Sequence, residues 1–139
     1  MNTKALSAFA AIGAAAVMLL TAGCGVGEIG AEGKIAQAAD DYLRALAEDD
    51  TATACAQLAA TAKSNFSRPC DAELRQVASR IGTDALSAAA DAGVDVTVDG
   101  TRGLAEIRDL DVRLTLAKVG PEWRITSGHA LDTNGGATS

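Results

Sequence analysis

The stretch Val94-Asp95-Val96-Thr97-Val98-Asp99-Gly100 decides the fold, because the hydrophobic pattern of the chain changes there. Its three valines alternate with polar residues, as in a strand with one buried face, and Asp-Gly is a hairpin-turn signal. Before this stretch, apolar residues recur at helical spacing, and after it they alternate. We therefore expect an α+β domain in which N-terminal helices pack on an antiparallel sheet.

Three further strands are expected after the Asp-Gly turn, at 102–107, 110–116 and 122–126. Arg108-Asp109 and Gly120-Pro121 would make the turns between them. Together with the first strand they form a curved meander of about four strands. The residues expected to face the helices are Leu110, Val112, Leu114, Leu116, Trp123 and Ile125.

Four helices are expected before the sheet, at 34–48, 51–62, 70–81 and 83–90. Each carries an apolar stripe at three- and four-residue spacing. Thr51, Asp71 and Thr83 are suitable N-cap residues for the last three. Gly82 and Gly93 would end the third and fourth helices, since glycine accepts the backbone conformation of a helix end.

The first 23 residues have the parts of an export signal: Lys4, an uncharged apolar run from Ala5 to Leu20, and small residues before Cys24. The sequence Leu20-Thr21-Ala22-Gly23-Cys24 resembles the lipobox of bacterial lipoprotein precursors. The resemblance implies cleavage before Cys24, whose thiol would carry a diacylglyceryl group. Plain secretion and an uncleaved membrane-spanning helix are the alternatives.

Two acyl chains on Cys24, fatty acids such as palmitate, would hold the protein on the extracytoplasmic face of the cell membrane, because one chain binds only marginally. The remaining 116 of the 139 residues suffice for one domain. We expect a glycine-rich tether at 24–33, a single domain at 34–127 and a flexible C-terminal tail at 128–139.

The charge of the mature chain argues against nucleic acid as a partner. Loss of Lys4 leaves 11 basic and 18 acidic side chains, a net charge of about −7. The basic residues are scattered, whereas binding to phosphates needs clustered cations.

Cys55 and Cys70 remain once Cys24 is assigned to the lipid. In an oxidising compartment two such thiols of a small domain are usually bridged, so we expect a disulfide. A loop of about 15 residues closed in this way would stabilise the fold by roughly 3 kcal/mol.

A family resemblance rests on Ala39-Asp40-Asp41-Tyr42-Leu43-Arg44-Ala45-Leu46, Ala54-Cys55, Cys70, the valine-alternating strand and Glu122-Trp123-Arg124-Ile125. With these residues the chain resembles small actinobacterial lipoproteins with a nuclear transport factor 2-like domain, over residues 34–127. The resemblance implies a cone that encloses a pocket, used for catalysis by some relatives and for binding or pairing by many.

Candidate site residues are few. Tyr42 lies on the buried stripe of the first helix and is expected to pack in the core, with pocket chemistry as the alternative. Glu106 is expected to face solvent and Trp123 to fill the core. The pairs Asp40-Asp41 and Asp49-Asp50 lack the spacing of a calcium loop and read as solvated.

His129 is the single histidine, and with Ser127 and Asp132 it invites comparison with a nucleophilic triad. Triads are assembled across a fold around an oriented base, so closeness in sequence is poor evidence for one. We expect His129 to lie on the solvated tail.

The sequence therefore predicts a non-enzymatic envelope lipoprotein that binds a small apolar ligand or a protein partner at the membrane surface. It offers no catalytic, cofactor-binding or metal-binding residue. The alternative is a pocket enzyme of the isomerase or hydratase type, which would need two ionisable groups converging in the cone. Pairing of two copies through the open sheet face would need an exposed apolar stripe on 102–117.

Overall fold

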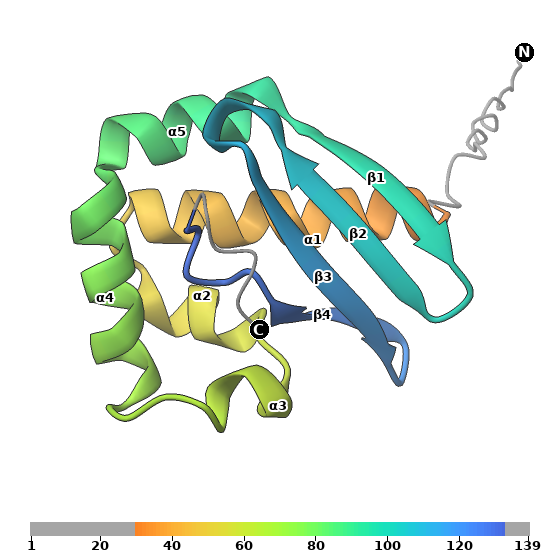
Figure 1. Cartoon of the computed structure of the whole chain (residues 1–139), viewed down its shortest axis with the longest axis horizontal. Helices are drawn as coiled ribbons and strands as arrows, with labels where there is room; N and C mark the ends of the chain where they lie inside the picture. The colour runs from red at the N-terminus through yellow and green to blue at the C-terminus, as the bar shows by residue number, and fades with distance from the viewer. Residues whose placement is uncertain (1–29, 133–139) are drawn as a thin grey trace, which may run out of the picture.

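A computed structural model describes residues 30–132 and has the expected α+β class, with helices packed against a four-stranded antiparallel sheet (Figure 1). The export signal expected at 1–23 and the lipidation expected at Cys24 lie outside the described residues. The elements in chain order are α1 (Ala31–Ala47), α2 (Thr51–Ala56), α3 (Ala60–Lys63), α4 (Cys70–Ile81), α5 (Thr83–Ala92), β1 (Val94–Asp99), β2 (Arg102–Ile107), the 3-10 turn η2 (Arg108–Leu110), β3 (Val112–Val119) and β4 (Glu122–Ser127).

The sheet is an open meander in the order β1-β2-β3-β4. Its register pairs Val94 with Ile107 and Leu116 with Ile125. Leu110 lies in η2 rather than in the third strand, because Asp111 takes a left-handed conformation (φ 54°) and the extended backbone begins after it. The predicted alternation otherwise holds from β1 to β4, with the apolar residues facing the helices.

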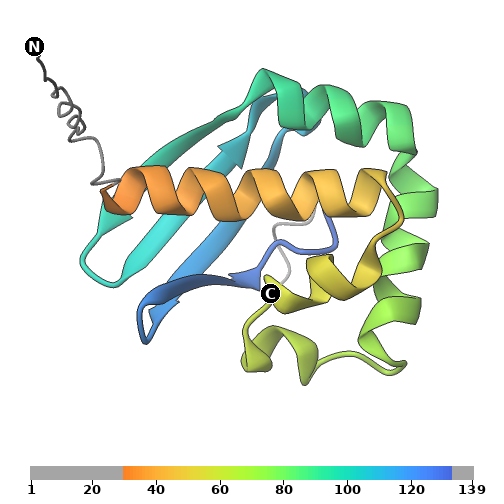
Figure 2. The same cartoon turned by 180° about the vertical axis from the view of Figure 1, so that it is seen from behind.

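Helix α1 lies along the inner face of the sheet and buries Ile35, Tyr42, Leu43 and Leu46 completely. Its close approach depends on Gly103 of β2. A Cβ atom at this position would lie 2.3 Å from Cδ1 of Ile35, so a larger residue would force the Ile35 side chain to shift. Figures 1 and 2 show α1 covering the sheet on one side only.

The predicted start of the domain at residue 34 is wrong by three residues, because α1 already begins at Ala31. Gly30 precedes the helix in an extended conformation and its carbonyl accepts the backbone N–H of Lys34. Glycines lower helix propensity, yet packing of Ile35 anchors this first turn on the sheet.

The helix expected at 51–62 is two helices. Residues 57–59 leave the helical conformation and pair with β4: Ile125 N–H donates to the Gln57 carbonyl, and Ala59 N–H donates to the Ile125 carbonyl, both at 2.8 Å. Leu58 is thereby buried, to 2% exposure. These bonds satisfy the outer edge of β4, which offsets the loss of the helical bonds.

The expected caps also differ. Asp50, and not Thr51, caps α2, since its carboxylate accepts the Thr53 N–H at 3.2 Å. Asp71 and Thr83 lie inside the first turns of α4 and α5, whose cap positions carry no side-chain hydrogen bond.

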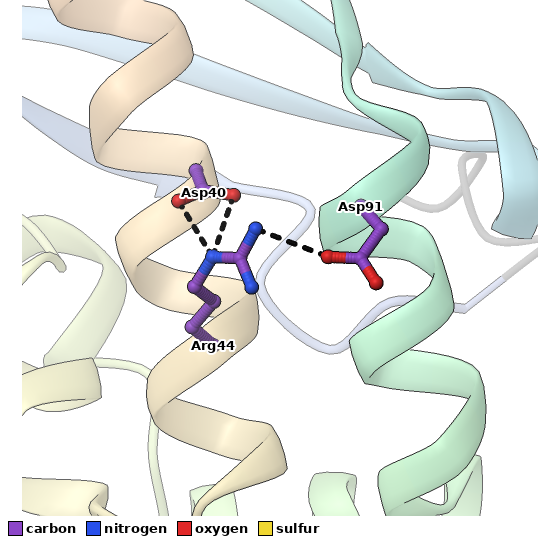
Figure 3. A network of polar contacts seen from close by, with 3 residues as sticks. All are labelled: Asp40, Arg44 and Asp91. Atoms are coloured by element: carbon purple, nitrogen blue, oxygen red, sulfur yellow. Dashed lines mark hydrogen bonds and ion pairs between the residues drawn. The ribbon is translucent and has the colours of Figure 1, made fainter.

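The helical layer is tied together by a covalent and a polar link. The predicted disulfide between Cys55 of α2 and Cys70 of α4 is present, with a Cα–Cα distance of 6.1 Å. Arg44 of α1 bonds Asp40 on its own helix at 2.9 Å and Asp91 of α5 at 3.2 Å (Figure 3). These three side chains are exposed or partly exposed, so solvent screens the ion pairs and they contribute little to stability.

Candidate functional site

The C-terminal segment Gly128–Asp132, here called the strap, follows β4 and contacts both α1 and α4. After β4 the chain continues past α1 and α4, whose residues Tyr42 and Arg80 bond its backbone. Leu131 joins the core at 1% exposure and its N–H bonds the Gly128 carbonyl at 3.0 Å. The prediction of a flexible tail from residue 128 is therefore wrong for 128–132. A single apolar residue such as Leu131 among polar residues forms no periodic pattern, so the sequence does not indicate that this segment is ordered. Burial of its side chain nevertheless favours an ordered segment.

Tyr42 holds the strap from the side of α1. Its hydroxyl donates to the backbone carbonyl of His129 at 2.6 Å. Burial raises the pKa of the Tyr42 hydroxyl far above its ordinary value, so the group stays protonated and remains a donor. Tyr42 thus has the core position expected for it, and its hydroxyl is engaged by backbone.

Arg80 holds the strap from the side of α4. Its guanidinium donates to the carbonyl of Ala130 and pairs with the Asp132 carboxylate at 3.0 Å. The two contacts fix both the backbone and the last described side chain of the strap. A planar guanidinium supplies several donors at once, which suits it to such a double contact.

His129 is partly buried and not solvated as expected, because the strap holds it against the loop that follows α3. Its ring meets Phe66 edge-on, with ring centroids 5.2 Å apart. Its Nδ1 atom is buried and has no hydrogen-bond partner. Burial lowers the pKa of the imidazole, and Asp132 and Glu73 oppose this. The imidazole is therefore neutral at pH 7.

The residues that invited comparison with a triad do not form one. The Asp132 carboxylate pairs with Arg80, and Ser127 is exposed at the end of β4. A histidine base needs a partner that orients the ring through its second nitrogen. Nδ1 of His129 has no such partner.

The inner face of the sheet offers apolar side chains to the helices. Its buried residues are Ala105, Ile107, Val112, Leu114, Leu116, Trp123 and Ile125. Glu106 points outward as expected and pairs with Arg113 at 2.8 Å, with 47% of its own side chain exposed. Trp123 fills the core as expected, at 5% exposure.

The acidic pairs are engaged locally. Asp40 pairs with Arg44, while Asp49 lies 3.8 Å from Arg75. Partial burial and the neighbouring Asp40 raise the pKa of Asp41. Within residues 30–132 there is no cluster of histidine, cysteine or acidic side chains that could hold a metal ion.

A surface groove of about 320 Å³ lies between the α2–α3 connection and the β3–β4 hairpin. Lys63 and Arg124 border it, and Arg124 is fixed by contacts to the Ala56 carbonyl and to Glu122. No pattern in the sequence indicates this groove, because it forms where residues 57–59 pair with β4. Its lining residues are Ala56, Leu58, Ala59, Ala60, Lys63, Val119 and Arg124.

The outer face of the sheet is mainly polar. Arg102, Glu106, Arg113 and Thr115 point away from the helices, with Leu104 between them. On this described face the exposed apolar stripe that would favour pairing of two copies through 102–117 is not found. Ion pairs join Asp95 of β1 to Arg108 of η2 and Glu106 of β2 to Arg113 of β3.

Among residues 30–132 there is no helix with the length and apolar character needed to span a membrane. Comparisons of the chain with protein-family models, with curated proteins and with solved structures gave no match. The resemblance to nuclear transport factor 2-like lipoproteins therefore stays a prediction.

Proposed function

We propose that this chain is a non-enzymatic cell-envelope lipoprotein, anchored through acyl chains on Cys24, whose domain binds a partner or a small apolar ligand at the membrane surface. The observation that carries the proposal is the disulfide between Cys55 and Cys70. Disulfides of small domains persist in oxidising compartments outside the cytoplasm. The chain reaches such a compartment by export, for which residues 1–23 have the pattern.

The count of cysteines supports the anchor. With Cys55 and Cys70 bonded to each other, Cys24 is the one cysteine of the chain left over, and it directly follows the small residues Ala22 and Gly23. Diacylation there supplies the two chains that stable anchoring requires.

The strap supports binding over catalysis. Leu131 of the strap packs in the core between the helices and the sheet, and the Tyr42 hydroxyl donates its hydrogen bond to the strap backbone. The enzyme alternative needs a tyrosine or histidine that faces a bound substrate together with a carboxylate. In this arrangement the outer surface, including the groove beside β4, is what the domain presents to a ligand or partner.

Mass spectrometry of the membrane-associated protein tests the proposal. We expect a mature chain that begins at an acylated Cys24 and weighs two hydrogens less than the reduced form. A Cys24→Ser variant should leave the membrane fraction. The matched control, Cys55→Ser with Cys70→Ser, removes the other two cysteines and should stay membrane-bound.

Two results would contradict the proposal. One is an intact Met1 on the protein found in membranes. The other is equal membrane association of the Cys24→Ser variant and the parent, which would mean that something other than a lipid on this sulfur holds the protein.

A further inference from the structure

We infer that the end of the domain next to the tether docks on the lipid surface, with Val119 at its tip; this rests on the proposed anchoring through Cys24. The docking end is formed by residues 30–34 of the α1 start, 99–102 of the β1–β2 turn and 118–122 of the β3–β4 turn. The partner is a bilayer that contains anionic phospholipid. The inference concerns which end of the domain faces the bilayer, because a lipid anchor on Cys24 does not by itself fix the orientation of the domain.

Contacts bring the three segments of the docking end together. Gly103 lies against Ile35 of α1, and a Cβ there would also be 3.5 Å from the Trp123 ring at the start of β4. The backbone N–H of Lys118 donates to the Thr101 carbonyl at 2.9 Å, which joins the two turns. Figures 1 and 2 show both turns at the end of the molecule where α1 begins.

The length of chain before the domain brings this end close to the membrane. Six residues lead from Cys24 to Gly30, and a chain of that length spans at most about 20 Å. Helix α1, with 17 residues, is itself about 26 Å long. The tether is thus shorter than α1, and it keeps the start of α1 within about 20 Å of the bilayer while both ends of the domain can still reach the surface.

Charge separates the two ends of the domain. The opposite end, residues 48–51 and 70–84, carries six acidic and two basic side chains, a net charge of −4. The docking end carries three of each sign, a net charge of zero. An anionic surface repels the first end and not the second, within about a Debye length. The charged residues of the docking end are Glu32, Lys34, Asp99, Arg102, Lys118 and Glu122.

Val119 gives the docking end an apolar tip. Among residues 30–132 it is the one large apolar side chain that is exposed, at 52%. It is the last residue of β3, directly before the Gly120-Pro121 turn, so its exposed side chain lies at the tip of the hairpin. The tether keeps the domain at millimolar effective concentration near the bilayer, so a weak contact suffices for docking.

Fluorescence quenching on vesicles tests the inference. Acylated full-length mature protein is placed in vesicles of phosphatidylglycerol and phosphatidylethanolamine whose headgroups carry a nitroxide. A fluorophore is attached at Thr101→Cys in the docking end or, as the matched control, at Ser79→Cys on α4. We expect quenching at least threefold stronger at position 101. Equal quenching at the two positions would overturn the inference.

A second variant separates docking from mere closeness of the tether. With the fluorophore at position 101, Val119→Asp should reduce quenching at least twofold, whereas Ser79→Asp, the same charge on the opposite end, should not. Unchanged quenching in Val119→Asp would overturn docking. The mass of the same sample distinguishes the two proposals: a chain without acyl groups overturns both, and an acylated chain with unselective quenching overturns docking alone.

Discussion

The sheet and the strap both face the helices, but they are held in different ways. The sheet is held by a continuous register and by large apolar side chains such as Leu114, Leu116 and Ile125. The strap is held by a turn at Gly128, one buried leucine and a few side-chain contacts to its backbone. Regular elements distribute their stability over many similar bonds, whereas an irregular segment depends on each contact.

This difference predicts that single substitutions open the strap and leave the sheet folded. Amide hydrogen exchange can follow both regions in one experiment, because the sheet amides should exchange through global unfolding and the strap amides through local opening.

The largest loss of stability is expected for Gly128→Ala, which disturbs the turn between the sheet and the strap. Gly128 has φ 85°, and a Cβ would lie 2.1 Å from the carbonyl oxygen of Arg113. Backbone strain and the clash with fixed backbone together should cost about 4 kcal/mol of unfolding free energy, measured by urea denaturation. The matched control Gly93→Ala, at φ 84° with open space around it, should cost about 2 kcal/mol from backbone strain alone. Equal losses in the two variants would contradict the close approach.

Leu131→Ala should have the next largest effect. The residue is almost fully buried, so truncation should lower the unfolding free energy by about 3 kcal/mol. Its φ of 56° strains leucine and alanine alike, so the loss reports burial and not backbone strain. Val119→Ala, at an exposed apolar position, should change stability by less than about 0.5 kcal/mol. If Leu131→Ala behaved like Val119→Ala, the strap would not belong to the core.

Tyr42→Phe removes the hydroxyl bond to the His129 carbonyl and keeps the ring. A lost hydrogen bond that leaves a partner unsatisfied costs about 1.5 kcal/mol, and exchange of the strap amides should accelerate. Thr126→Val, which removes a 3.1 Å bond to the Thr115 carbonyl inside the sheet, is the comparison. There we expect no faster exchange of the strap. If amide exchange of the strap accelerated equally in both variants, the hydroxyl of Tyr42 would not be what stabilises the strap.

The smallest effect is a pH dependence carried by His129. Its pKa in the folded chain lies below the ordinary 6.5. Above pH 6.5 the imidazole is neutral in both the folded and the unfolded chain. Below pH 6.5 the unfolded chain binds a proton before the folded chain does. The free energy of unfolding therefore falls as the pH drops from 6.5 through the lowered pKa of the folded chain. His129→Asn should flatten this part of the profile relative to the parent in thermal unfolding between pH 7 and pH 5. Parallel profiles would mean that the imidazole is not desolvated by the strap.

Much of the fold could be predicted from local pattern. The alternation of valines predicted β1, and the glycine at Asp99-Gly100 predicted its turn, because strand faces and hairpin turns depend on neighbouring residues. Cys55 and Cys70 were paired by compartment and count. The break at residues 57–59 could not be predicted, because it is driven by bonds to Ile125, far away in sequence.

The candidate site was less predictable than the fold. Tyr42 was placed correctly, since it lies on a helical stripe, but its partner His129 is 87 residues away. The difference in net charge between the two ends of the domain could not be predicted either, because each end is formed by segments that are distant in the chain.

The sequence by itself determined the class of the fold and the strands with most of the helices, since each depends on periodicity within a short window. It also determined the disulfide pair, because the chain has three cysteines and one of them follows the apolar N-terminal run. The tertiary structure alone decided that 128–132 is a strap, that His129 is partly buried and that three separate segments form one end of the domain. These features depend on contacts between distant residues, and a contact of that kind leaves no period in the sequence.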